Sequence, residues 1–325
     1  MGRKNDSVQP TIITTKWKPW RVDLFPLGKP LSSRSNLVKF GSAVSVVTVG
    51  LLSKLWTKLN RFTIVNHDSF LKAAESNYNG SSGSPLLTIS NHSSCLDDPV
   101  LWGALLPWSW QFNMYRHRWV SAADDICFTK TWHTWFFATG NTFPIERGSG
   151  IYQPAIDFAV QLLKEKRLLH WFPQGRVAEE SDISLLPCDS HTPLTLSDKT
   201  VDGVKPYHFK WGIGRLILEA LETPDKENGT AIEKIEVLPF YHIGMNEILP
   251  NVEPYIPRIM KRVTIYIRKE GPIIFDRDLI NWIYEKHGKL KSNQILEEKR
   301  IAISKFLEDE VKKIKLEAMK VHWVV

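Results

Sequence analysis

Residues 86–99, LLTISNHSSCLDDP, decide the fold of this chain. The run Leu86–Ser90 is apolar and β-favouring, which predicts a short buried strand. Asp98 followed by Pro99 predicts the N-cap and the first position of a helix. His92 and Asp97 therefore lie where a strand ends and a helix begins.

The spacing of His92 and Asp97 limits how the two side chains can meet. Positions five apart on a regular α-helix point about 140° apart, so contact between them requires a turn. A carboxylate bonded to one imidazole nitrogen fixes the tautomer and supports the protonated ring, which leaves the other nitrogen free as a general base. The pattern indicates a catalytic pair; the alternative is a capping aspartate beside a surface histidine.

The composition indicates a globular protein with anionic partners. The chain has 325 residues, 43% hydrophobic and 24% charged, which suffices for a sizeable core. Its thirteen tryptophans and net charge of +7 favour an anionic membrane surface, because Trp rings settle at the lipid interface and basic groups attract anionic headgroups. No zinc spacing, basic zipper region or RNA-binding motif appears, so no nucleic-acid partner is expected. Three widely spaced cysteines argue against a disulfide scaffold.

Two segments are expected before the main domain. Residues 1–35 are polar and basic, and four prolines prevent a long helix there. In residues 36–60, the fourteen uncharged residues 40–53 fall short of the roughly 20 that span a bilayer as a helix. We interpret 36–60 as a membrane-interface segment; a buried helix and a short signal-like stretch are the alternatives.

Residues 61–325 alternate predicted strands and helices, which indicates one α/β domain. Strands are expected at 168–172, 235–241 and 263–267, and helices at 153–166, 209–221 and 294–320. The aromatic-rich part, 102–135, predicts an acyl channel, a lipid-facing surface or a plain core. Residues 177–205 lack periodicity and are expected to form an insertion.

Two turns that follow predicted strands carry candidate binding residues. Arg147-Gly148 is the first, and an arginine suits a phosphate because its planar fork donates two parallel hydrogen bonds. Gln174-Gly175-Arg176 is the second, where backbone N–H groups can hold an oxyanion or a phosphate. An ordinary turn is the alternative for each.

Four blocks in this order resemble the glycerophospholipid acyltransferase superfamily. They are N-H-x-x-x-x-D from Asn91 to Asp97, Phe143–Gly148, Phe172–Gly175 and Val237–Phe240. The resemblance covers about residues 40–270. It implies a single acyltransferase domain with a central, mostly parallel sheet flanked by helices.

The resemblance also implies roles for the site residues. His92 is expected to deprotonate a lysolipid hydroxyl, and Asp97 to orient it. Arg147 with Gly148 is expected to hold a lipid phosphate, and Gln174, Gly175 and Arg176 to shape the site around the headgroup or the tetrahedral intermediate. The family usually has glutamate where this chain has Gln174. No metal and no cofactor is expected.

Within the superfamily, the resemblance is closest to enzymes that move acyl chains between phospholipids and lysophospholipids without CoA and remodel cardiolipin. The residues that carry it are Asp125–Lys130, Gly150–Gln153, Phe209–Arg215 and His242–Asn246. It implies a monotopic protein of mitochondrial membranes that faces the intermembrane space. An acyl-CoA-dependent lysophospholipid acyltransferase is the near alternative, and a non-catalytic lipid-binding protein is the alternative of another class.

Overall fold

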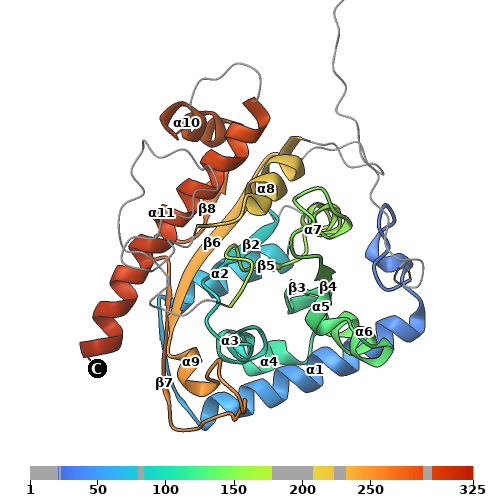
Figure 1. Cartoon of the computed structure of the whole chain (residues 1–325), viewed down its shortest axis with the longest axis vertical. Helices are drawn as coiled ribbons and strands as arrows, with labels where there is room; N and C mark the ends of the chain where they lie inside the picture. Colours follow the sequence, from blue (N-terminus) through green and yellow to red (C-terminus); the bar gives the residue numbers. More distant parts are fainter. Residues whose placement is uncertain are drawn as a thin grey trace, which may run out of the picture.

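A computed structural model of the chain describes residues 21, 23–79, 84–177, 208–222, 232–287 and 295–324. In this part of the chain, helices cover both faces of an eight-stranded sheet (Figure 1). The strand order is β1-β7-β6-β2-β5-β3-β4, and β8 pairs with β6. Only the pairings of β6 with β7 and β8 are antiparallel among the described strands, so the predicted α/β class with a mostly parallel sheet is confirmed.

The described elements begin and end as follows. The strands are β1 (Arg61–Val65), β2 (Leu86–Ile89), β3 (Trp119–Ala123), β4 (Thr142–Ile145), β5 (Leu169–Trp171), β6 (Ile235–Ile243), β7 (Arg262–Ile267) and β8 (Ile273–Phe275). The helices are η2 (Leu31–Ser33), α1 (Asn36–Lys58), α2 (His67–Tyr78), α3 (Asp97–Leu105), α4 (Trp108–Gln111), η3 (Met114–Arg116), α5 (Asp124–Cys127), α6 (Thr131–Thr139), α7 (Pro154–Lys164), α8 (Gly212–Glu222), α9 (Met245–Ile248), α10 (Arg277–His287) and α11 (Ile295–Val324). The strands and helices expected from the sequence are present at these places.

Strand β2 lies at the centre of the sheet and is buried on both faces. Leu87 and Ile89 point into the core formed with α7, α8 and α11, whereas Leu86 points into the core formed with α2 and α3. A strand that is covered on both sides has no water-facing row, which is why this segment is a continuous apolar run and not an alternating one.

The parallel strands place the three motif turns at one edge of the sheet. Strands β6, β2, β5, β3 and β4 all run in the same direction. The turns after β2, β4 and β5 therefore leave at their carboxyl ends, where open α/β sheets usually bind ligands.

The helix after β2 differs in one detail from the prediction. It begins at Asp97, and Asp98 is not its N-cap, because the cap residue is Leu96 and no side chain caps this end. The Asp98 carboxylate instead accepts from the Nε of Arg118 at 2.8 Å. A partner 20 residues away has displaced the local capping interaction.

The described part of residues 1–35 packs against the domain. Leu24 and Phe25 are fully buried in the core. The Gln161 side-chain amide on α7 donates to the carbonyls of Pro26 and Lys29, at 3.1 and 2.6 Å. Leu24 and Phe25 are therefore core residues of the protein and do not face lipid. The predicted insertion at 177–205 lies outside the described residues except for Val177.

Candidate active site

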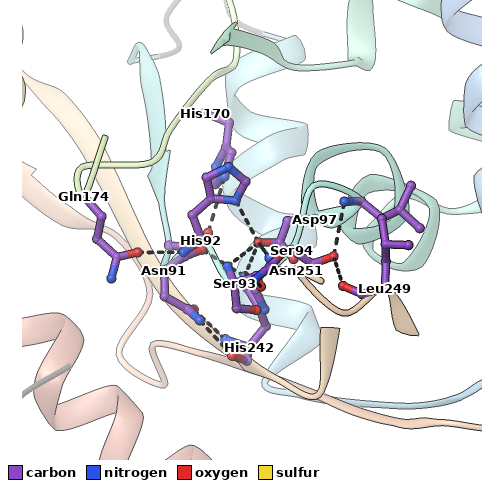
Figure 2. A network of polar contacts seen from close by, with 12 residues as sticks. Asn91, His92, Ser93, Ser94, Asp97, His170, Gln174, His242, Leu249 and Asn251 are labelled. Carbon is purple, nitrogen blue, oxygen red and sulfur yellow. Dashed lines mark hydrogen bonds and ion pairs between the residues drawn. The ribbon is translucent and has the colours of Figure 1, made fainter. Parts of the chain in front are cut away.

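His92 and Asp97 meet at the end of β2. The Nδ1 of His92 lies 2.8 Å from the Asp97 Oδ2 (Figure 2). Asp97 is fully buried, whereas the His92 side chain keeps 21% of its surface exposed. Since Nδ1 is engaged by the carboxylate, Nε2 is the nitrogen left for a substrate. This is the arrangement of a general base held by a buried carboxylate.

A tight turn brings the two side chains together, as the spacing predicted. The backbone N–H groups of Ser93 and Ser94 donate to the same Asp97 Oδ2, at 2.6 and 3.0 Å. The Asp97 N–H in turn donates to the Ser94 carbonyl at 3.0 Å. The carboxylate thus closes the turn and receives charge-assisted hydrogen bonds, which are stronger than neutral ones.

The hydroxyls of both serines in the turn are buried. The Ser94 hydroxyl is buried and donates to the Leu249 carbonyl at 3.0 Å. The Ser93 hydroxyl is also buried, and the Ser93 carbonyl accepts from Asn251 Nδ2 at 2.9 Å. Neither hydroxyl is presented to solvent beside the imidazole, so the geometry favours direct attack by a substrate hydroxyl over a serine acyl-enzyme.

The turn after β5 supports His92 from a second side. The Phe172 ring stacks on the imidazole with 4.1 Å between the ring centroids. The buried Gln174 accepts from the His92 N–H through Oε1 at 2.7 Å. Gly175, at φ 71°, has a left-handed backbone that allows the chain to turn away here. Gln174 therefore holds the backbone of His92 by a hydrogen bond.

A pair of substitutions at Gln174 separates hydrogen bonding from charge. Gln174→Glu keeps an oxygen for the His92 N–H, so we expect kcat/KM to stay within about threefold of wild type. Gln174→Met has similar size but no acceptor, and leaving a buried N–H unpaired costs about 1–3 kcal/mol, so kcat/KM should fall by about tenfold or more. Steady-state kinetics of both variants check this. Equal activity of Gln174→Met and wild type would contradict a supporting role.

Arg147 and Gly148 lie on an exposed loop after β4. The Arg147 guanidinium is paired with Asp125, and its Nε donates to the Asp125 Oδ1 at 3.2 Å. The hydrogen bond raises the pKa of Arg147 and lowers that of Asp125. The described contacts bring neither Arg147 nor Gly148 against His92. Because both partners of the pair are exposed, a phosphate can replace the Asp125 carboxylate at little cost.

Two residues near the site were not among the predicted site residues, although both lie in segments that carry the resemblance. Gln153 holds the Arg147 loop: its Nε2 donates to the Gly150 carbonyl at 2.6 Å and its Oε1 accepts from the Glu146 N–H at 2.8 Å. Lys210 donates from its backbone N–H to the Pro173 carbonyl at 2.8 Å, and its side chain passes over Gly175. An exposed lysine therefore lies beside the turn that carries Gln174 and Arg176.

Two further histidines lie behind the pair, both fully buried. The His170 Nδ1 is 2.9 Å from the Thr88 hydroxyl, and its ring contacts Phe172 edge-on. Burial lowers the pKa of His170 well below its ordinary value, and burial also lowers that of His242. Both rings are therefore neutral at physiological pH.

Comparison with known proteins gives consistent matches. The family model described as Acyltransferase matches residues 57–243. The chain is 34% identical over 236 residues to Tafazzin of Drosophila melanogaster, which covers 71% of this chain and 52% of the fly protein. It is 32% identical over 211 residues to a Dictyostelium discoideum protein named Taffazin, covering 65% of this chain and 62% of that one. It is also 32% identical over 237 residues to N-acylphosphatidylethanolamine synthase of Arabidopsis thaliana, covering 71% and 70%. The chain spans about half the length of the fly relative.

Proposed function

This chain belongs to the acyltransferase family, and we propose that it transfers acyl chains between phospholipids and lysophospholipids without CoA and so remodels cardiolipin. The observation that carries the proposal is the His92–Asp97 pair, in which a buried carboxylate holds Nδ1 and leaves Nε2 for a substrate hydroxyl. The likeness to proteins named tafazzin supports phospholipids as both donor and acceptor.

The proposed reaction exchanges one ester for another. Nε2 of His92 takes the proton from the lysolipid hydroxyl while the hydroxyl oxygen attacks the ester carbonyl of the donor phospholipid. Asp97 stabilises the imidazolium that forms. The tetrahedral intermediate then collapses, the bond to the donor glycerol oxygen breaks, and that oxygen receives the proton back from His92. One ester and one hydroxyl are consumed and formed, so no external energy is required.

The substrate phosphates need cations near this centre. Arg147 is proposed to exchange Asp125 for a lipid phosphate, with the Gly148 backbone close to it. Gln174, Gly175 and Arg176 are proposed to shape the headgroup side of the site. Lys210 adds a further exposed cation beside Gly175 and the exposed Arg176. Exposed cationic side chains suit a phosphodiester, whose charge is spread over two oxygens.

One assay separates this function from the alternatives. Purified protein is incubated with an acyl-labelled phospholipid and a lysophospholipid, with and without acyl-CoA. Transfer without CoA is the expected result. Transfer only with acyl-CoA would indicate the CoA-dependent enzyme, and label on the ethanolamine nitrogen would indicate the reaction named for the Arabidopsis relative. Lipid binding without any acyl transfer would indicate a non-catalytic lipid-binding protein.

The helix α1 is proposed to lie in the membrane interface without crossing it. It has 23 residues and is, among the described helices, long and apolar enough to span a bilayer by length and composition. One face, however, carries small and polar residues and packs on α3, α4 and α6 along the domain (Figure 1). The opposite face of α1 and its C-cap residue Leu59 expose apolar side chains: Leu37, Phe40, Val44, Leu52, Leu55 and Leu59. A helix fixed along the domain in this way can enter lipid on one side only.

The aromatic-rich part of the chain extends this face. Helices α4 and α6 and the turn η3 all contact α1. The exposed aromatic side chains on these elements, and directly after α4, are Trp108, Phe112, Tyr115, Trp132, Trp135 and Phe136. We name these residues, the five outward residues of α1 and Leu59 the apolar surface. Aromatic rings are favoured at the level of the lipid headgroups, and basic residues favour an anionic leaflet.

Charge placed on the apolar surface is expected to weaken membrane binding. The double variant Phe40→Glu, Leu55→Glu should bind vesicles that contain anionic phospholipid about tenfold or more weakly, because each apolar side chain loses about 1.5–3 kcal/mol of burial in lipid. Leu316→Glu, at a similarly exposed position on α11, is the matched control and should bind as wild type does. Vesicle flotation measures both. Equal losses for the two variants would contradict the assignment of this face.

For the cellular location, we propose a mitochondrial membrane with the domain facing the intermembrane space, on the likeness to tafazzin. Protease treatment of isolated mitochondria tests this. The protein should be cleaved only after the outer membrane is ruptured, and cleavage in intact mitochondria would contradict it.

A further inference from the structure

His242 holds the first residue of the catalytic turn. Its backbone N–H donates to the Asn91 Oδ1 and its carbonyl accepts from the Asn91 Nδ2, both at 2.9 Å. Its ring Nε2 lies 2.8 Å from the Asn91 carbonyl oxygen (Figure 2). Strand β2 has ended at Ile89, so the Asn91 side chain continues the pairing of β2 with β6 beyond the last strand residue. Three hydrogen bonds thus attach the residue before His92 to β6.

The partners of the His242 ring determine its tautomer. A carbonyl oxygen only accepts, so Nε2 must carry the hydrogen. Nδ1 is buried and has no hydrogen-bond partner among the residues that the structure describes. The titratable groups that face the ring are Asp97, His92 and the buried, neutral His170. Burial outweighs the attraction of Asp97 and lowers the pKa of His242. The ring is therefore neutral, with its N–H in a fixed direction.

The same ring nitrogen also lies near the catalytic carboxylate. Nε2 of His242 is 3.6 Å from the Asp97 Oδ2, the oxygen that also engages His92. The positive end of a neutral dipole lies next to this oxygen and cannot be displaced, because both side chains are fully buried. A neutral dipole stabilises a carboxylate without exchanging a proton with it.

We propose that His242 is a positioning residue for acyl transfer: its Nε2–H donates to the Asn91 carbonyl and places the positive end of a fixed dipole near the Asp97 carboxylate, which sets the geometry and the proton affinity of His92. The proposal rests on the proposed function for its kinetic consequences only. A residue that merely filled space here would affect folding and would leave the pH dependence of the base unchanged.

Substitutions at His242 remove or keep the N–H. His242→Phe keeps the ring and loses the donor, and His242→Gln places an amide N–H near the Nε2 position. We expect kcat of His242→Phe to fall about 10- to 100-fold with KM nearly unchanged, because the base is misplaced and substrate contacts are not. The acid limb of kcat/KM should move up by about half a pH unit, because loss of the dipole's positive end favours protonated His92. His242→Gln should restore most of the rate and the original limb.

A readout without turnover keeps this proposal separate from the proposed function. Diethyl pyrocarbonate modifies unprotonated imidazole, and mass spectrometry reports the rate at His92, which is partly exposed. The midpoint of this rate against pH should move upward in His242→Phe and stay in place in His242→Gln. If His242→Phe does not fold, His242→Asn replaces it, because its shorter amide does not reach the Nε2 position. Midpoints equal in all folded variants, or a shift in His242→Gln as large as in the donor-free variant, would overturn the proposal.

Discussion

Alanine in place of His92 is expected to reduce kcat for acyl transfer by a factor on the order of 10³ or more, because a positioned general base contributes about 10²–10⁴-fold and no other group takes its place. His92 is partly exposed, and the turn is closed by backbone donors to Asp97 that the substitution leaves in place. The fold should therefore survive, with the free energy of unfolding within about 1 kcal/mol of wild type. Initial rates with labelled phospholipid and thermal unfolding measure the two quantities.

Asp97→Asn tests the other half of the pair. The amide keeps the size and one accepting oxygen, but it lacks the charge that supports the imidazolium, so kcat should fall by about 10²-fold or more. His133→Ala, at a histidine on α6 that contacts only Thr129 by hydrogen bond among the described residues, is the matched control and should leave kcat unchanged. Full activity of His92→Ala would contradict a catalytic role of this site in acyl transfer, whether the acyl donor is a phospholipid or acyl-CoA.

The strand, turn and helix around His92 could be predicted because their signals are local. The apolar run of β2 fits a strand buried on both faces. The distance of five positions between His92 and Asp97 requires a turn, and the structure has one. The same reasoning located Arg147 and Gln174 at strand ends. Periodicity and turn chemistry act over a few residues, so a single sequence carries them.

The contacts that support the base could not be predicted, because they join residues far apart in the chain. Gln174 lies 82 positions after His92, and His242 lies 151 positions after Asn91. The motif blocks indicated that these segments belong to one family pattern, but not which atom bonds to which. A tertiary partner also overrode one local expectation: Asp98 binds Arg118 and does not cap its helix. The pairing of Arg147 with Asp125, 22 positions away, had no local signal either.

A substitution at Gly214 on α8 is expected to have a large effect on stability. Helix α8 packs on α11, and Gly214 lies at the point of closest approach. A Cβ on Gly214 would overlap the Arg300 carbonyl oxygen and lie 2.8 Å from the Arg300 Cα. These are backbone atoms, so no side-chain rotation can relieve the overlap and the two helices must move apart.

Gly214→Ala is therefore expected to lower the free energy of unfolding by about 3 kcal/mol, the upper part of the usual range for overpacking. In a chain of this size that corresponds to a fall in Tm of about 4–5 °C. Gly212→Ala is the matched control on the same helix: its Cβ would meet Ile156 and Trp171 at 3.6 and 3.8 Å, which is ordinary contact. Its Tm should stay within about 2 °C of wild type, because alanine's better helix propensity is small. Scanning calorimetry of wild type and both variants measures these Tm values. The Glu308 carboxylate on α11 accepts from the Phe209 N–H at 3.0 Å, which ties this helix to the segment that contacts Pro173 and limits how far it can shift. Equal Tm values for the two variants would contradict this and mean that α11 moves away from α8 at little cost.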